Sequence, residues 1–342
     1  MTRSTAWCRN GLLLFGLLVA GGCSPGERAD IGERADIGER PETEVRPETG
    51  VRAGPGAGTE TGEARDATSA AVRVVTDDAG RTWSLAHPPE RVLSLVPSAT
   101  LLLLELGHGD RLVGRTEFDT DPRLAGLPSV GGGLGPSLEV MLSLRPDLVV
   151  RFEGPTDPET PRRLDQAGIP HLALRFDQVE DILRAAYLLD EAVGPAGAGG
   201  PGEATGPGRK PGSAGELVRG ITAELEAVAL AVTGGERPQV GILLGGDPPW
   251  MASPTTYIGQ VVAIAGGDNV FADDTGLYAP ISVEEVLRRR PDVLLLTDGA
   301  RLPTALRGLP VLRAPASLGI PGPDIGATAW AVARLLHPDR VP

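Results

Sequence analysis

The sequence predicts an α/β protein of two similar doubly wound lobes, joined by one long interdomain helix, with a ligand cleft between the lobes. The main observation is a duplicated segment, SLEVMLSLRPDLVV at 137–150 and SVEEVLRRRPDVLL at 282–295, whose copies align without a gap. Each copy has a serine that can cap a helix, a first-turn glutamate, an Arg-Pro that ends the helix, and an aliphatic run typical of a buried strand. The segments before both copies also share the order strand, loop, helix, which favours a duplicated architecture over a chance match.

Length and composition agree with this fold class and exclude several functions. A chain of 342 residues with 41% apolar content has enough material for about two globular domains. Its net charge of −13 argues against nucleic acid or an acidic membrane surface as a partner. Both cysteines, Cys8 and Cys23, lie near the N-terminus, and the four histidines have no paired helical spacing, so we expect no metal site.

The N-terminal region predicts export. Residues 1–23 contain two arginines, an apolar stretch at 11–20 and two glycines directly before Cys23. This segment resembles a bacterial lipoprotein signal peptide, which implies that Cys23 becomes the lipidated first residue of the mature chain. Ordinary export with an incidental cysteine is the alternative. Residues 24–71 repeat GERADI and RPET without an apolar stripe, and we interpret them as a disordered tether.

The first lobe is predicted at 72–193. It begins with a hairpin whose turn is the Asp-Asp-Ala-Gly at 77–80, and it continues as alternating strands and helices. This alternation favours a parallel sheet with helices on both faces. The expected strands are 91–96, 112–115, the end of the first repeat copy and 171–174, and the expected helices begin at Ala99, at 137, at 158 and at 178.

The two lobes are separated by a flexible segment and a helix. Residues 194–215 consist mostly of Gly, Pro and Ala and predict a flexible insertion. The interdomain helix at 216–234 has one apolar stripe and a glycine, Gly234, that can end it. The second lobe, 235–342, repeats the order of strand and helix and ends in a helix at 323–336.

Motifs for catalysis are missing from the sequence. The GGGLGPS at 131–137 lacks the third spaced glycine of a dinucleotide-binding fingerprint, and no phosphate-binding loop or G-x-S-x-G motif is found. We therefore predict that the protein is not an enzyme. An exported α/β enzyme and a surface scaffold or adhesion module remain as alternatives from other classes.

The carboxyl ends of the strands are the predicted binding region, because ligands of doubly wound sheets bind in the crevice outside those ends. Most of the few aromatic residues fall there, on what the sequence predicts to be loops. The candidate ligand-binding residues are Pro97, Ser98, Phe118, Gly132, Gly133, Phe152 and Glu153 in the first lobe, and Asp247, Trp250, Tyr278, Ser317 and Leu318 in the second.

An ordered set of motifs resembles a known family. RVLSLVPSAT at 91–100, LGHGDRLVGRTEF at 106–118, LPSVGGG at 127–133 and the two repeat copies resemble the substrate-binding proteins of ABC importers for vitamin B12, ferric siderophores and haem, most closely the B12 branch. The resemblance implies a transport function with a permease and its ATPase as partners. It also implies that a glutamate on each lobe, Glu139 and Glu284, docks with arginines of the permease.

The resemblance implies a transported ligand and no cofactor of the protein's own. Where the B12 branch has Tyr this chain has Phe118, where some members have Trp it has Gly133, and the usual Gly-Pro-Arg near the C-terminus ends in Asp324. Phe152 and Tyr278 take positions where Trp is common. We expect cobalamin or a related corrinoid, with a ferric siderophore or haem as the alternative. The expected protein is an extracytoplasmic monomer that touches the membrane only through its lipid anchor.

Overall fold

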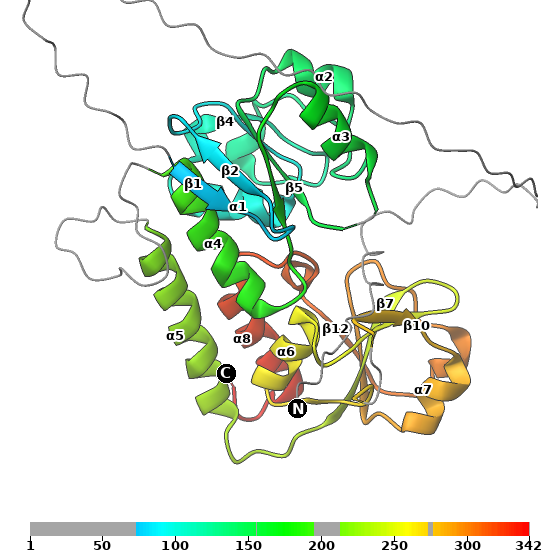
Figure 1. Ribbon diagram of the computed structural model, residues 1–342. Coiled ribbons are helices and arrows are strands. Elements are labelled where there is room, and N and C mark those ends of the chain that lie inside the picture. Colours follow the sequence, from blue (N-terminus) through cyan, green and yellow to red (C-terminus); the bar gives the residue numbers. More distant parts are fainter. Residues whose placement is uncertain (1–72, 155, 195–212, 273–275, 342) are drawn as a thin grey trace, which may run out of the picture. The chain divides into compact units, whose positions relative to one another are not determined.

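The computed structural model describes residues 73–154, 156–194, 213–272 and 276–341. The predicted signal segment, the tether and most of the glycine-rich insertion lie outside these residues. Cys23 lies outside them as well. A parallel sheet, a mostly parallel sheet, a small two-stranded sheet and the helices around them, including one long helix, make up the described part (Figure 1).

The first lobe is built on a four-stranded sheet of order β4-β3-β5-β6, in which all neighbours are parallel. The predicted hairpin is present as an antiparallel two-stranded sheet, β1-β2. The elements of this lobe are β1 (Arg73–Thr76), β2 (Thr82–Leu85), β3 (Val92–Ser94), α1 (Pro97–Glu105), β4 (Leu112–Gly114), α2 (Leu138–Ser143), β5 (Leu148–Phe152), α3 (Glu159–Gln166), β6 (His171–Leu174) and α4 (Val179–Val193), with short 3-10 helices at Gly109–Arg111 and Pro122–Leu124.

The second lobe has a sheet of order β10-β8-β7-β11-β12, and β9 pairs with the first residues of β7. Its β7, β9, β11 and β12 are parallel, whereas β8 and β10 are antiparallel additions at one edge. The elements are β7 (Gln239–Gly245), β8 (Trp250–Ala252), α6 (Tyr257–Ile264), β9 (Asp268–Asn269), β10 (Tyr278–Pro280), α7 (Val283–Arg289), β11 (Val293–Leu296), β12 (Val311–Arg313) and α8 (Ile325–Leu336), with 3-10 helices at Thr304–Leu306 and Ala316–Gly319.

The parallel strands of the two lobes have the same connectivity. In chain order the strands β3, β4, β5 and β6 give the spatial order β4-β3-β5-β6, and β7, β9, β11 and β12 give β9-β7-β11-β12. The repeated segments form α2 with β5 and α7 with β11. The prediction of two similar α/β lobes is therefore confirmed at the level of topology.

Alternate residues of the central strands pack on opposite faces of each sheet, as expected for strands that are covered on both sides. In β5, Leu148 and Val150 join the core that contains α1 and α4, whereas Val149 joins a second core with Met141 of α2 and Leu164 of α3. The second lobe repeats this division. Its β11 residues contribute alternately to the core with α6 and α8 and to a separate core with α7.

The long helix α5 (Ala214–Val232) packs against helices of both lobes. It contacts α4 of the first lobe and α8 and α6 of the second. Its buried face includes Ile221, Leu225, Val228 and Val232, four of the five residues of the predicted apolar stripe, and the fifth, Leu217, is partly buried. Gly234 has a φ of 73°, a left-handed conformation that suits glycine after a helix end.

The repeated Arg-Pro-Asp has the same structural role in both lobes. Asp147 accepts hydrogen bonds from the backbone N–H groups of Glu90 and Arg91, at 2.9 Å each, directly before β3. Asp292 accepts one from Gln239, the first residue of β7, at 2.8 Å. Each aspartate thus ties the repeated helix-strand unit to the start of the central strand, and satisfies backbone donors that would otherwise lack a partner.

The helix ends of the repeat differ in two ways from the sequence prediction. Arg145 and Arg290, which precede the prolines, both have left-handed φ values, 46° and 49°, instead of the extended conformation expected there. Ser282 caps α7 by accepting from the Glu285 N–H, whereas the Ser-x-x-Glu sequence at 282–285 predicts a full capping box, in which the Glu285 carboxylate also accepts from the Ser282 N–H. The Glu285 carboxylate turns instead to Arg288 and Arg289 of its own helix.

Candidate functional site

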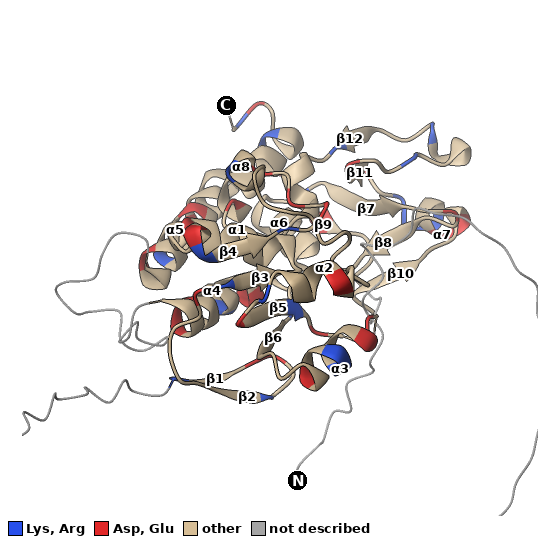
Figure 2. Cartoon of the chain, turned by 90° about the horizontal axis from the view of Figure 1, so that it is seen from above, with Lys and Arg blue, Asp and Glu red and all other residues tan. Residues whose placement is uncertain are grey.

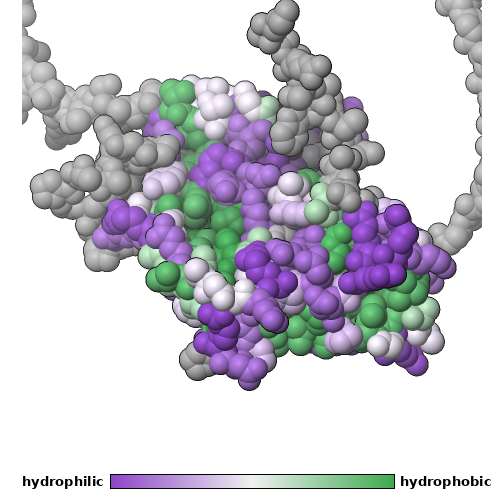
Figure 3. Space-filling view, turned by 90° about the horizontal axis from the view of Figure 1, so that it is seen from below, coloured by the Kyte–Doolittle hydropathy of each residue, from purple (hydrophilic) through white to green (hydrophobic). Residues whose placement is uncertain are grey.

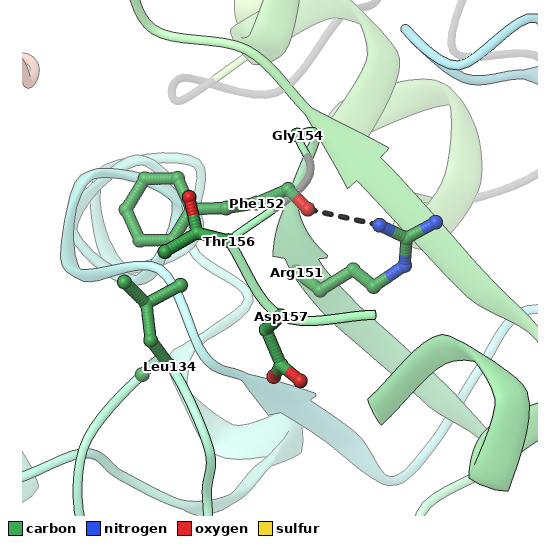
Figure 4. Close-up of a pocket in the computed structure, with 7 residues that line it drawn as sticks. Leu134, Arg151, Phe152, Gly154, Thr156 and Asp157 are labelled. Atoms are coloured by element: carbon green, nitrogen blue, oxygen red, sulfur yellow. Dashed lines mark hydrogen bonds between the residues drawn. The ribbon is translucent and has the colours of Figure 1, made fainter. Parts of the chain in front are cut away.

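The carboxyl end of β5 forms the wall of a hollow in the first lobe (Figure 4). The hollow is open to solvent and shallow, with enclosed room of about 10 Å³, roughly that needed for one water molecule. The Phe152 ring lies beside Thr156 and Leu134, and the Arg151 side chain extends to the opposite side. The lining residues are Gly133, Leu134, Arg151, Phe152, Gly154, Thr156 and Asp157. The predicted pair Gly133 and Phe152 is therefore brought together.

Gly133 is required where the glycine loop passes the end of β3. A Cβ atom on this residue would lie 2.2 Å from the backbone oxygen of Leu95, far inside van der Waals contact. No side chain fits here unless the backbone moves. The Trp that some relatives have at this position is therefore excluded by the path of the loop, and the space beside the Phe152 ring stays open.

Phe118 lies on a loop after β4 that is stabilised by internal hydrogen bonds. The Asp119 carboxylate accepts hydrogen bonds from the N–H and the hydroxyl of Thr116, at 2.7 and 2.8 Å, and the Phe118 N–H donates to the same hydroxyl. The Phe118 side chain is 38% exposed. A Cβ atom on Gly132 would be 3.9 Å from its ring, so the glycine loop and this aromatic residue are neighbours.

Arg151 lines the hollow and is held in place by two hydrogen bonds. Its Nε donates to Nδ1 of His171, at 3.1 Å, and a terminal nitrogen donates to the Phe152 carbonyl, at 2.9 Å. His171 is fully buried, and burial lowers the pKa values of both residues. The sequence reasoning missed Arg151, although a charged residue within the aliphatic run LVVRF was a usable signal.

Charged groups cluster at the ends of β5 and β6. Glu153, a predicted ligand residue, forms an ion pair of 2.8 Å with Arg175. Asp177 follows in the same loop, 3.9 Å from the Arg175 guanidinium. Burial, together with the neighbouring Asp181 carboxylate, raises the pKa of Asp177 to about 6. The Glu153 carboxylate is thus engaged within the lobe, and a ligand would meet an ion pair instead of a free anion.

The aromatic candidates of the second lobe lie at strand ends, so the prediction that they sit on loops is wrong. Trp250 begins β8 and Tyr278 begins β10, two antiparallel strands that the sequence did not predict. In the first lobe, Phe152 ends β5, where the sequence predicts the end of a strand. Trp250 is half-buried, while Asp247, in the turn before it, is exposed. Burial raises the pKa of the Tyr278 hydroxyl well above its usual value.

The remaining candidates are held mainly by the fold itself. Pro97 and Ser98 are the first residues of α1, which begins two residues before the predicted start at Ala99; both are buried, and the N-cap is Val96. Leu318 is fully buried, and its carbonyl accepts from the Tyr257 hydroxyl at 3.0 Å. Ser317 is exposed and accepts from Thr328 at 2.8 Å. In this conformation the exposed Ser317 side chain can therefore contact a ligand, whereas the buried side chains of Ser98 and Leu318 cannot.

Glu139 and Glu284 lie in the first turns of α2 and α7, and both are exposed. Acidic residues on these two short helices are visible in Figure 2. Neither carboxylate has an ion pair with another described residue. They are free to meet a partner, and they are not part of the hollow in the first lobe.

Two negative findings apply to the described residues alone. No group of three or more histidine, cysteine, aspartate or glutamate side chains among them could hold a metal ion. In that same part of the chain, no helix combines the length and the apolar character needed to cross a membrane.

Comparison with known proteins places this geometry in a family. Residues 92–198, which include β3 to α4 and the hollow, match the model of the periplasmic binding protein family. The first lobe is thus similar to this family over most of its described length. The vitamin B12-binding protein of Vibrio parahaemolyticus is 28% identical over 215 residues, which are 63% of this chain and 73% of that protein. An uncharacterised ABC transporter substrate-binding lipoprotein of Bacillus subtilis, YvrC, is 26% identical over 70% of this chain and 73% of its own length.

Solved structures of periplasmic binding proteins have the same two-lobed fold. The apo haem-binding protein RhuT of Roseiflexus sp. RS-1 matches with a TM-score of 0.60 and 27% identity, over 73% of this chain and 98% of that one. The B12-binding protein BtuF of Vibrio cholerae matches with a TM-score of 0.58 and 22% identity, over 73% and 97%. The predicted fold class and the predicted resemblance are confirmed. The proteins matched by these comparisons are binding proteins.

Proposed function

We propose that this periplasmic binding protein captures cobalamin or a related corrinoid outside the cytoplasm and delivers it to an ABC permease and its ATPase. The observation that carries the proposal is the arrangement at the strand ends of the first lobe. There an open hollow lined by Phe152 and by the glycine loop lies at the strand ends, where ligands of doubly wound sheets bind. The similarity to B12-binding proteins supports the ligand class.

Each lobe offers both aromatic and polar groups to a ligand. The exposed Phe118 and the Phe152 ring offer apolar faces to a large ring system, and the Arg175–Glu153 pair offers polar contact at the edge. In the second lobe, Trp250 and Tyr278 offer aromatic surface, and Asp247 and Ser317 are exposed polar groups. A haem or a ferric siderophore is the second candidate, favoured by the similarity to a haem-binding protein.

The test is a titration of the purified chain with cyanocobalamin, haemin and a ferric hydroxamate siderophore. We expect cyanocobalamin to quench the intrinsic fluorescence saturably, because Trp250 lies among the proposed contacts. A Trp250→Phe variant should lose most of the quenching and retain binding in calorimetry. Saturable binding of haemin or the siderophore with no response to cyanocobalamin would transfer the function to the second candidate.

We also propose that the protein is anchored through a lipid on Cys23, the residue that follows the signal-like segment. A lipid chain and a tether would hold the domain near its permease without contacting the site. Cys23→Ala should therefore move the protein from the membrane fraction to the soluble extracytoplasmic fraction, with unchanged ligand affinity. Membrane fractionation measures this, and a variant that stays with the membrane would contradict the anchor.

A further inference from the structure

The repeated helices α2 and α7 each expose one leucine at the same position of the repeat. Leu142 is 38% exposed and Leu287 is 44% exposed, and the two residues align in the duplicated segment. The described part of the chain has few exposed large hydrophobic side chains: Val74, Phe118, Leu142, Leu230 and Leu287. Two of these five are therefore related by the internal duplication.

Exposure by itself says little, since single apolar residues are common on protein surfaces. Figure 3 shows such residues scattered among polar ones on one face of this molecule. The exposure of a leucine at the same position in both copies of the repeat is more informative. The core positions of the same helices are taken by Met141 and Val286, which are both fully buried. The exposed leucines are thus not needed to attach their helices to the sheets.

Each leucine lies three residues after the exposed glutamate of its helix. Residues at this spacing are neighbours on one helix face, so Glu139 lies beside Leu142 and Glu284 beside Leu287. Each lobe therefore presents one carboxylate next to one apolar side chain. We call these two-residue surfaces the α2 patch and the α7 patch.

The surroundings of the α7 patch keep its carboxylate free. Arg288 and Arg289 are both paired with Glu285, the neighbour of Glu284. In the α2 patch the corresponding positions are Val140, Ser143 and Leu144, so no arginine competes there. Two different local sequences thus leave the same surface chemistry, an unpaired carboxylate beside an exposed leucine.

We propose that Leu142 and Leu287 are apolar anchors of the permease interface, each inserted into a pocket beside the arginine that pairs with the neighbouring glutamate. This inference rests on the proposed function, and it adds a contact that the paired charges do not supply. Charge pairs mainly set orientation and the rate of encounter, whereas desolvated apolar contacts mainly slow dissociation. The fitting partner presents an apolar pocket next to a cation, once for each patch.

The test measures binding of the full-length chain to its host's permease–ATPase complex in lipid nanodiscs by surface plasmon resonance. Burying the exposed part of one leucine predicts that Leu142→Ala or Leu287→Ala weakens affinity about 5-fold, and the double variant about 25-fold. We expect this loss of affinity to come from faster dissociation, and we expect the salt dependence of binding to stay unchanged. Glu139→Gln and Glu284→Gln should instead slow association and reduce the salt dependence.

Leu230→Ala is the matched control, because Leu230 is 76% exposed on α5 and lies outside both patches. It should bind like the wild type, and all variants should keep their thermal midpoint and ligand affinity. Leucine variants that bind the complex as tightly as the wild type would overturn the anchor inference alone. A wild-type chain that does not bind the complex would overturn the proposed delivery function and the inference with it.

Discussion

Replacement of both Glu139 and Glu284 by arginine is expected to abolish ligand uptake by cells while leaving ligand affinity unchanged. Both carboxylates are exposed, lie on short helices outside the hollow, and have no ion pair with another described residue. Like charges placed opposite the proposed permease arginines would repel them, and this repulsion costs several kcal/mol at an interface. Alanine in place of either glutamate should reduce uptake less, and the double alanine variant should be intermediate.

Glu285→Gln is the control for this experiment, since Glu285 is adjacent to Glu284 and its carboxylate is already paired with Arg288 and Arg289. Its loss should lower helix stability only slightly, since exposed ion pairs contribute little, and leave uptake near the wild-type level. Uptake is measured in cells whose own copy of the gene has been deleted. If the Glu139 and Glu284 variants lose ligand binding but deliver the remaining bound fraction normally, the docking role is wrong.

Gly133→Ala is expected to weaken ligand binding about 10-fold or more, a free-energy loss of about 1.4 kcal/mol. The added methyl group would lie 2.2 Å from the Leu95 oxygen, so the loop must move away from the end of β3 and displace the wall of the hollow next to Phe152. Such overpacking should also lower the free energy of unfolding by about 1 to 3 kcal/mol. Calorimetric titration and thermal unfolding measure the two effects.

Gly132→Ala separates this steric effect from a general sensitivity of the glycine loop. A Cβ atom on Gly132 would have its nearest contact at 3.4 Å, an ordinary distance, and the residue has no left-handed φ. We expect this variant to fold and to bind ligand nearly as well as the wild type. Equal losses in the two variants would mean that loop flexibility, and not the contact with Leu95, determines the site.

Much of the fold could be predicted because the local signals agree with one another. The duplicated Arg-Pro-Asp followed by an aliphatic run predicted two helix-strand units, and these are α2 with β5 and α7 with β11. The apolar stripe of α5 predicted its buried face. Such patterns depend on the spacing of apolar residues within a single helix or strand, and this spacing can be read directly from the sequence.

Less of the site could be predicted, because its features depend on residues that are distant in the chain. The steric role of Gly133 arises from Leu95, which lies 38 positions earlier in the sequence, and the support of Phe152 by Arg151 depends on His171. The strands β8 and β10 were missed because they have three residues each, too few to show a period. They place Trp250 and Tyr278 at strand ends instead of on loops.

The sequence by itself therefore determined the two-lobed α/β architecture and the long helix, since these follow from local periodicity and from the alignment of the two repeat copies. The family resemblance was visible in the ordered set of motifs. The tertiary structure alone decided which side chains are available. It buried Ser98 and Leu318, engaged Glu153 with Arg175, and left Glu139, Glu284, Leu142 and Leu287 exposed. The physical reason is that exposure and pairing depend on contacts between elements, and these exist only after the chain has folded.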